Sequence, residues 1–137
     1  MSFDLNLDHL KTFKSNYIFL AHGGEDYERF LSLIGDKIEL KGWKGFAGGL
    51  DARENTTGTH SYFTTWNDYE LMYHVATMLP MEAGDQQVQK KRHLGNDIIL
   101  VVFQEEGSEP FIPNCVKSNY IRKCWINKRI KRVYSRH

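Results

Sequence analysis

The run Ile98-Ile99-Leu100-Val101-Val102-Phe103 is the longest uninterrupted apolar stretch of the chain. Its residues are mostly β-branched, and no polar side chain alternates with them, which predicts a strand that is buried on both faces. A strand of this kind needs a sheet that is covered on both sides. The run therefore favours a sheet flanked by helices over a sheet with one face in water.

The residues just before this run predict a helix. Asp85 can cap it, the stretch 86–94 contains neither Gly nor Pro, and Gly95 is a natural stop. At 3.6 residues per turn, the helix has an apolar side toward the strand, made by Val88, the stem of Lys91 and Leu94. Its polar side carries Gln89, Arg92, His93 and Asn96. We therefore expect the end of this helix to present a guanidinium, an imidazole and a carboxamide together.

The remaining elements follow from local signals. Residues 25–34 carry apolar side chains at helical spacing before Gly35, and a short strand is expected within 37–43. Residues 60–66 and 69–77 predict a hairpin around the turn dipeptide Asn67-Asp68. A short strand at 17–20 and a helix at 113–121 complete the prediction. This order indicates one α/β domain with a mixed β-sheet flanked by helices.

Several other classes of site are disfavoured. The glycines of 45–49 lack the endings of nucleotide-binding loops, so we interpret that segment as structural. The spacing of His60, His74 and His93 is not that of metal ligands, and a strand histidine is usually satisfied by its neighbours. Nothing in the sequence brings Asp51 and Glu70 together as an acid pair. The aromatic residues Trp43, Tyr62 and Trp66 are expected in the core.

Length and charge point to a single cytoplasmic domain. The 137 residues suffice for one core, with no apolar run long enough to cross a bilayer and no signal-peptide pattern. Cys115 and Cys124 form no disulfide framework, which suits a reducing compartment. Residues 117–137 hold eight of the 18 Lys and Arg and no acid. This tail is either simply solvated or in weak contact with an acidic membrane, whereas no motif supports nucleic-acid binding.

The central stretch resembles a known family. Lys90-Lys91-Arg92-His93-Leu94-Gly95-Asn96-Asp97-Ile98-Ile99, preceded by the segment 74–80 and followed by 102–105, is similar to the Rap/Ran-GAP domain of Rap GTPase-activating proteins, which also occurs in tuberin. Further similarity lies in the segments 42–51, 56–61 and 110–113. The resemblance extends over roughly 27–120 and is closest to the Rap-directed branch. It implies a catalytic domain with a G-domain-like sheet and no nucleotide of its own.

The resemblance also implies a mechanism. GTP hydrolysis needs a water held in line with the γ-phosphate, and the family supplies an "asparagine thumb" to a Rap-type GTPase that lacks the usual glutamine. The matching residue here is Asn96. The resemblance also implies that His93 is a catalytic residue, either by contacting the GTPase or by setting the helix end. Lys91, Arg92 and Gln89 are the candidate partner-binding residues. The chain would then be an activator acting in trans, with no cofactor or metal of its own, because GTP and Mg²⁺ belong to the partner.

Plainer interpretations stay open for the same residues. Asn96 is also a residue type that tolerates the end of a helix, and a lone helical histidine such as His93 is as often structural. The side chains of Lys91 and Arg92 steer toward an acidic GTPase surface or form a solvated basic face.

The sequence departs from the family pattern after residue 120. The family continues into a further apolar strand, whereas residues 121–129 are heavily charged and alternate poorly. We therefore expect a remnant of an upstream region at 1–24, a partial catalytic domain at 25–121 and a basic divergent tail at 122–137. If the missing strands matter, the alternative function is a catalytically inactive GTPase-binding or interaction fragment.

Overall fold

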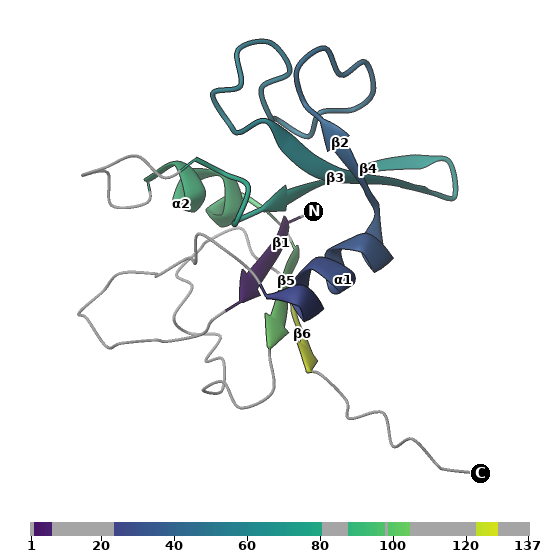
Figure 1. The fold of residues 1–137 in the computed structure, drawn as a ribbon, viewed down its shortest axis with the longest axis vertical. Helices are drawn as coiled ribbons and strands as arrows, with labels where there is room; N and C mark the ends of the chain where they lie inside the picture. The colour runs from purple at the N-terminus through teal and green to yellow at the C-terminus, as the bar shows by residue number, and fades with distance from the viewer. Residues whose placement is uncertain (1, 7–23, 81–87, 98, 105–122, 129–137) are drawn as a thin grey trace.

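The computed structural model describes residues 2–6, 24–80, 88–97, 99–104 and 123–128. Two helices, α1 (Glu25–Ile34) and α2 (Val88–Gly95), lie among six strands (Figure 1). The strands are β1 (Ser2–Asn6), β2 (Asp36–Glu39), β3 (His60–Trp66), β4 (Tyr69–Val75), β5 (Ile99–Gln104) and β6 (Lys123–Lys128).

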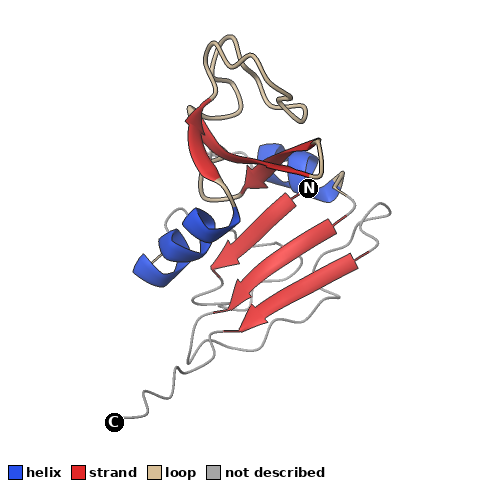
Figure 2. Ribbon diagram, turned by 90° about the vertical axis from the view of Figure 1, so that its right-hand side faces the viewer, coloured by secondary structure: helices blue, strands red, loops and turns tan. Residues whose placement is uncertain are grey.

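All six strands join one mixed sheet in the order β2-β3-β4-β1-β5-β6. The strands β2, β3 and β4 pair antiparallel, and the strands β4, β1, β5 and β6 pair parallel. Figure 2 shows β1, β5 and β6 side by side below the hairpin of β3 and β4. The predicted mixed sheet is therefore confirmed.

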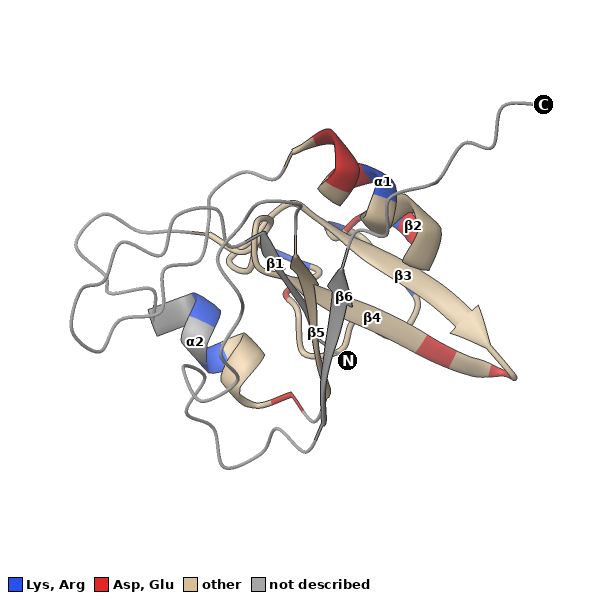
Figure 3. Ribbon diagram, turned by 90° about the horizontal axis from the view of Figure 1, so that it is seen from below, with Lys and Arg blue, Asp and Glu red and all other residues tan. Residues whose placement is uncertain are grey.

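The two helices lie on opposite faces of this sheet (Figure 3). One apolar cluster packs α1 against the sheet and includes Phe30, which stacks on Phe103 at 5.1 Å between ring centroids. The other cluster packs α2 and the glycine-containing loop (residues 42–50), and it includes Leu94 together with Leu100 and Val102 of β5. Both faces of β5 are therefore covered, as its apolar sequence predicts.

The elements with strong local signals match the prediction. Helix α1 has the bounds that the helical spacing gave. The hairpin turns at Asn67 and Asp68, whose φ values of 45° and 65° are those of the type I′ turns that suit a twisted hairpin. The expected strand at 17–20 and the helix at 113–121 lie outside the described residues.

Two strands were not expected. Residues 2–6 form β1 in the middle of the sheet, and residues 123–128 form β6 parallel to β5, in register from Ile99–Lys123 to Gln104–Lys128. The expectation that no strand follows residue 121 is wrong, because an edge strand tolerates charged residues that a central one does not. The domain boundaries themselves stay a prediction.

The expectation that Trp66 belongs to the core is also wrong. Its side chain is 64% exposed at the end of β3, opposite Tyr69 and beside the turn, where the hairpin extends past the covering layers (Figure 1). Tyr62, further back on the same strand, is buried, as predicted. Trp43 is half-buried and packs edge-on against Phe63 at 4.9 Å between ring centroids.

Candidate functional site

The end of α2 is fixed by one buried side chain and by a tight last turn. Leu94 is almost fully buried in the cluster beneath the helix. After Gly95 the backbone closes with hydrogen bonds from Asn96 N–H to the His93 carbonyl at 3.4 Å and from Asp97 N–H to the Leu94 carbonyl at 3.3 Å. These bonds to the third residue back use carbonyls that a helix end otherwise leaves unpaired. The residues after the helix therefore have a defined position.

The polar side chains of α2 are divided between solvent and protein. Those of Arg92 and Asn96 are exposed, His93 is half-buried, and Lys90 is buried at 1% exposure. The structure therefore brings Arg92, His93 and Asn96 together at one helix end, as the sequence predicts. The side chains of Gln89 and Lys91 lie outside the described part of the chain.

A buried histidine lies directly beneath this helix end. His74 of β4 contacts the Asp97 carboxylate through Nδ1, at 2.8 Å from Oδ2, and the Gly48 carbonyl oxygen through Nε2, at 2.6 Å. A carbonyl oxygen only accepts, so Nε2 carries a hydrogen, and a second hydrogen lies between Nδ1 and Asp97. Both side chains are 9% exposed, so this contact lies away from water.

The ring of His93 lies edge-on to the ring of His74, with centroids 5.5 Å apart. Burial is the main cause that lowers the pKa of His93 below its ordinary value of 6.5. The neighbouring positive charges of His74 and Arg92 lower it further, and the Asp97 carboxylate opposes them. His93 is therefore neutral at pH 7, with ring nitrogens able to accept as well as donate.

This protonation state is testable by NMR titration of the imidazole signals. We expect His93 to titrate below 6.5, and to titrate at higher pH in His74→Gln, because the substitution removes a neighbouring positive charge. A lowered pKa also means that the contribution of His93 to stability is complete above 6.5 and is lost as the pH falls through the lowered value. A His93 signal that titrates at or above 6.5 in the wild type would contradict this description.

Two carboxylates organise the loops beside the site. Asp51 accepts hydrogen bonds from the Thr56 hydroxyl at 2.7 Å and from the backbone N–H groups of Thr56, Arg53 and Glu54. These bonds hold the pKa of Asp51 far below its ordinary value, and the bond from the Thr56 side chain has the largest effect. Glu70 accepts from the Phe46 N–H at 2.7 Å. Each carboxylate therefore holds a loop, and the idea of an acid pair has no support.

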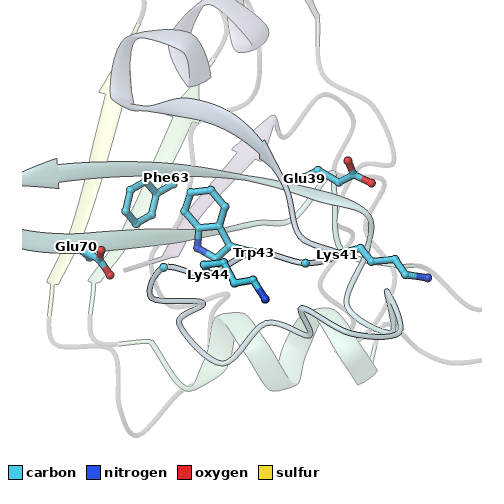
Figure 4. A pocket seen from close by; sticks show the side chains of 8 residues that line it. Glu39, Lys41, Trp43, Lys44, Phe63 and Glu70 are labelled. Carbon is cyan, nitrogen blue, oxygen red and sulfur yellow. The ribbon is translucent and has the colours of Figure 1, made fainter.

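A shallow groove of about 390 Å³ lies on the outer side of the glycine-containing loop. In Figure 4 the rings of Trp43 and Phe63 line its floor, while Lys41 and Lys44 lie on the loop. Within the described ranges, no group of three His, Cys, Asp or Glu residues could hold a metal ion. Across the same part of the chain, no helix is long and apolar enough to cross a membrane.

Sequence reasoning missed the partners of the helix end. His74 is satisfied by its neighbours, as expected of a strand histidine, but nothing local placed it under α2. Asp97 stood in the motif without a role, and Lys90 was not expected to be buried. No local pattern signals the contact between His74 and Asp97, because the two residues are 23 apart in the sequence.

Comparison with known proteins shows which family the chain belongs to. The family model described as Rap/ran-GAP matches residues 18–127. The chain belongs to the Rap/ran-GAP family. It is 48% identical over 97 residues to RapA guanosine triphosphatase-activating protein 1 of Dictyostelium discoideum. It is 50% identical over 101 residues to the human GTPase-activating Rap/Ran-GAP domain-like protein 3. These alignments cover 70% and 72% of this chain but only 9% and 10% of the relatives.

The fold comparison agrees with this assignment. The structure of the TSC2 GAP domain superposes with a TM-score of 0.82 and 27% sequence identity, and the match covers 96% of this chain and 70% of that one. The α/β architecture expected from the resemblance is therefore confirmed for this Rap/ran-GAP chain. The helix α2 and the exposed Asn96 that follows it lie within the region that the family model matches.

Proposed function

We propose that this Rap/ran-GAP chain accelerates GTP hydrolysis by a Rap-type small GTPase and supplies Asn96 in trans to position the attacking water. The observation that carries the proposal is the exposed carboxamide at a helix end that the core holds in place. A carboxamide offers an acceptor and two donors on one planar group, and it does not titrate. It can therefore orient a water molecule at any physiological pH.

The surroundings of Asn96 suit docking to a GTPase. Arg92 is exposed one turn before it, and the neutral His93 is half-buried between Arg92 and the sheet. We assign Arg92, Lys91 and Gln89 to partner binding and His93 to support of the helix end. The electrostatic attraction from Arg92 and Lys91 would favour an acidic GTPase surface and mainly speed association.

The proposed chemistry needs no cofactor or metal ion held by this chain. Phosphoryl transfer to water proceeds through positioning and charge stabilisation, and GTP and Mg²⁺ belong to the partner GTPase in this proposal. The chain is thus an activator rather than an enzyme with its own substrate pocket. The proposal places it in the cytoplasm, in keeping with two cysteines that form no disulfide framework.

The test is a single-turnover measurement of GTP hydrolysis by a Rap-type GTPase, with and without residues 1–137. We expect the rate to rise with the concentration of the chain and to saturate. An equal rate at every concentration, with a cooperative thermal melt that shows the chain to be folded, would remove the proposed activity.

A second candidate is GTPase binding without activation. It is favoured by one observation, which is that the match covers only 70% of the TSC2 GAP domain chain. Under this alternative the chain binds the GTP-loaded GTPase but leaves its hydrolysis rate unchanged. Titration of a GTPase with a fluorescent GTP analogue measures the binding separately from the rate, so the two candidates give different results.

A further inference from the structure

We propose that His74 and Asp97 are positioning residues, which fix the backbone beneath Asn96 and thereby aim its carboxamide. This inference rests on the proposed function, because it assigns a role to residues that act through Asn96. Neither residue is in a position to touch a partner, since each side chain is 9% exposed.

The residue next to Asn96 is attached to the sheet by its side chain. Asp97 follows Asn96 directly, and its side chain is buried while that of Asn96 is exposed. The backbone bonds that close the helix end are long, at 3.3 and 3.4 Å, whereas the bond from His74 Nδ1 to Asp97 Oδ2 is 2.8 Å. The contact of Asp97 has the usual length of a hydrogen bond, whereas the two backbone bonds are longer than the usual range. The side chain of Asp97 is therefore the firmest attachment of this segment.

His74, at the other end of this contact, is itself held in place. His74 lies on β4, an inner strand that pairs with β3 on one side and with β1 on the other. Its second ring nitrogen donates to the Gly48 carbonyl, so the ring is held at both nitrogens and cannot turn. The residue that fixes Asp97 is itself fixed by the sheet and by the glycine-containing loop.

The pair of His74 and Asp97 is better explained by a need for a fixed position than by a gain in stability. A buried ion pair is weak evidence for stability, because apolar side chains of the same volume often serve as well. What such a pair does provide is a single geometry. A catalytic group must be held within about 0.5 Å of its productive position, and a shift of about 1 Å costs about 100-fold in rate. The placement of the pair beside the proposed catalytic residue matches that need.

Two substitutions at one position separate the contacts of His74. In His74→Gln the amide nitrogen can replace Nε2 and donate to Gly48, but the bond to Asp97 is lost. In His74→Asn the amide nitrogen can replace Nδ1 and donate to Asp97, but the bond to Gly48 is lost.

We expect His74→Gln to lower the maximal stimulated rate at least 10-fold, with less than a threefold change in the half-saturating concentration of the chain. We expect His74→Asn to retain more of the rate than His74→Gln.

The double variant with Asn96→Ala gives the deciding measurement. If His74 acts only through Asn96, the variant that combines His74→Gln with Asn96→Ala is no slower than Asn96→Ala alone. If the double variant instead shows the product of the two single losses of rate, the inference is overturned and the proposed function stays in place. A His74→Gln variant that melts cooperatively and keeps the wild-type maximal rate would also overturn the inference and leave the proposed function in place. A wild-type rate for Asn96→Ala alone would overturn both, since there would be no catalytic asparagine to position.

If His74→Gln fails to fold, Asp97→Asn replaces it in the same cycle. The asparagine keeps the shape of the aspartate and can still accept from Nδ1, but it removes the charge. We expect a loss of maximal rate smaller than that of Asn96→Ala and again absent when Asn96 is alanine. A loss that multiplies with that of Asn96→Ala would contradict the positioning role.

Discussion

Replacement of Asn96 by alanine is expected to lower the maximal GTPase-stimulated rate by about 10³-fold, because catalytic groups supplied in trans contribute about 10³–10⁵ in this chemistry. The side chain is exposed, and no hydrogen bond engages it within the described part of the chain, so the free energy of unfolding should change by less than about 0.5 kcal/mol. The measurement is single-turnover hydrolysis at saturating concentrations of the chain.

Arg92→Ala is the matched control on the same helix. Arg92 is also exposed but is assigned to docking, so its loss should raise the half-saturating concentration and leave the maximal rate within about threefold. The two variants thus separate a group that acts in the transition state from one that acts in binding. A maximal rate that falls equally in both, or in neither, would contradict the assignment of Asn96.

The largest expected effect on stability is at Gly58. Its φ of +101° is one that residues with a side chain rarely adopt, and a Cβ there would lie 2.3 Å from the Met78 carbonyl oxygen. Backbone strain costs about 1–3 kcal/mol and the forced displacement about 1–3 more, so Gly58→Ala should lower the free energy of unfolding by about 4 kcal/mol. That is a large part of the roughly 5–15 kcal/mol typical of a domain. Urea denaturation provides the measurement.

Gly42→Ala is the control for Gly58. Its φ of +80° imposes a comparable backbone strain, but nothing lies within 4 Å of the added Cβ. It should therefore cost only about 1 kcal/mol, and the difference between the two variants isolates the contact with Met78. Equal losses for both would show that the chain at Met78 moves aside freely, against the close approach described here.

The elements that the sequence predicted well carry their own signals. Helix α1 has apolar residues at helical spacing, the hairpin has a turn dipeptide that accepts positive φ, and β5 has an apolar run that only a covered strand explains. In each case the information lies within about ten residues. Tertiary structure then confirmed what local preference had already indicated.

The elements that the sequence missed depend on distant partners. Strand β1 is defined by its pairing with β4 and β5, and β6 by its pairing with β5 alone. The short segment 2–6 and the charged segment 123–128 have little preference of their own. Trp66 was misplaced for a related reason, because a hairpin pattern does not show how far the covering layers extend.

The same distinction applies to the site. The polar trio of Arg92, His93 and Asn96 could be predicted because helical spacing brings them to one side. The contact between His74 and Asp97 joins residues 23 apart on different elements, so no local pattern contains it. The lowered pKa of His93 likewise results from tertiary burial and from its neighbour His74.

The most direct test is a structure of this chain bound to a Rap-type GTPase that holds GDP and aluminium fluoride, a mimic of the phosphoryl group in transfer. We predict that the end of α2 enters the nucleotide site and that the Asn96 carboxamide lies within hydrogen-bonding distance of the attacking water. A complex in which Asn96 faces away from the fluoride group would contradict the account, whatever the affinity of the two proteins.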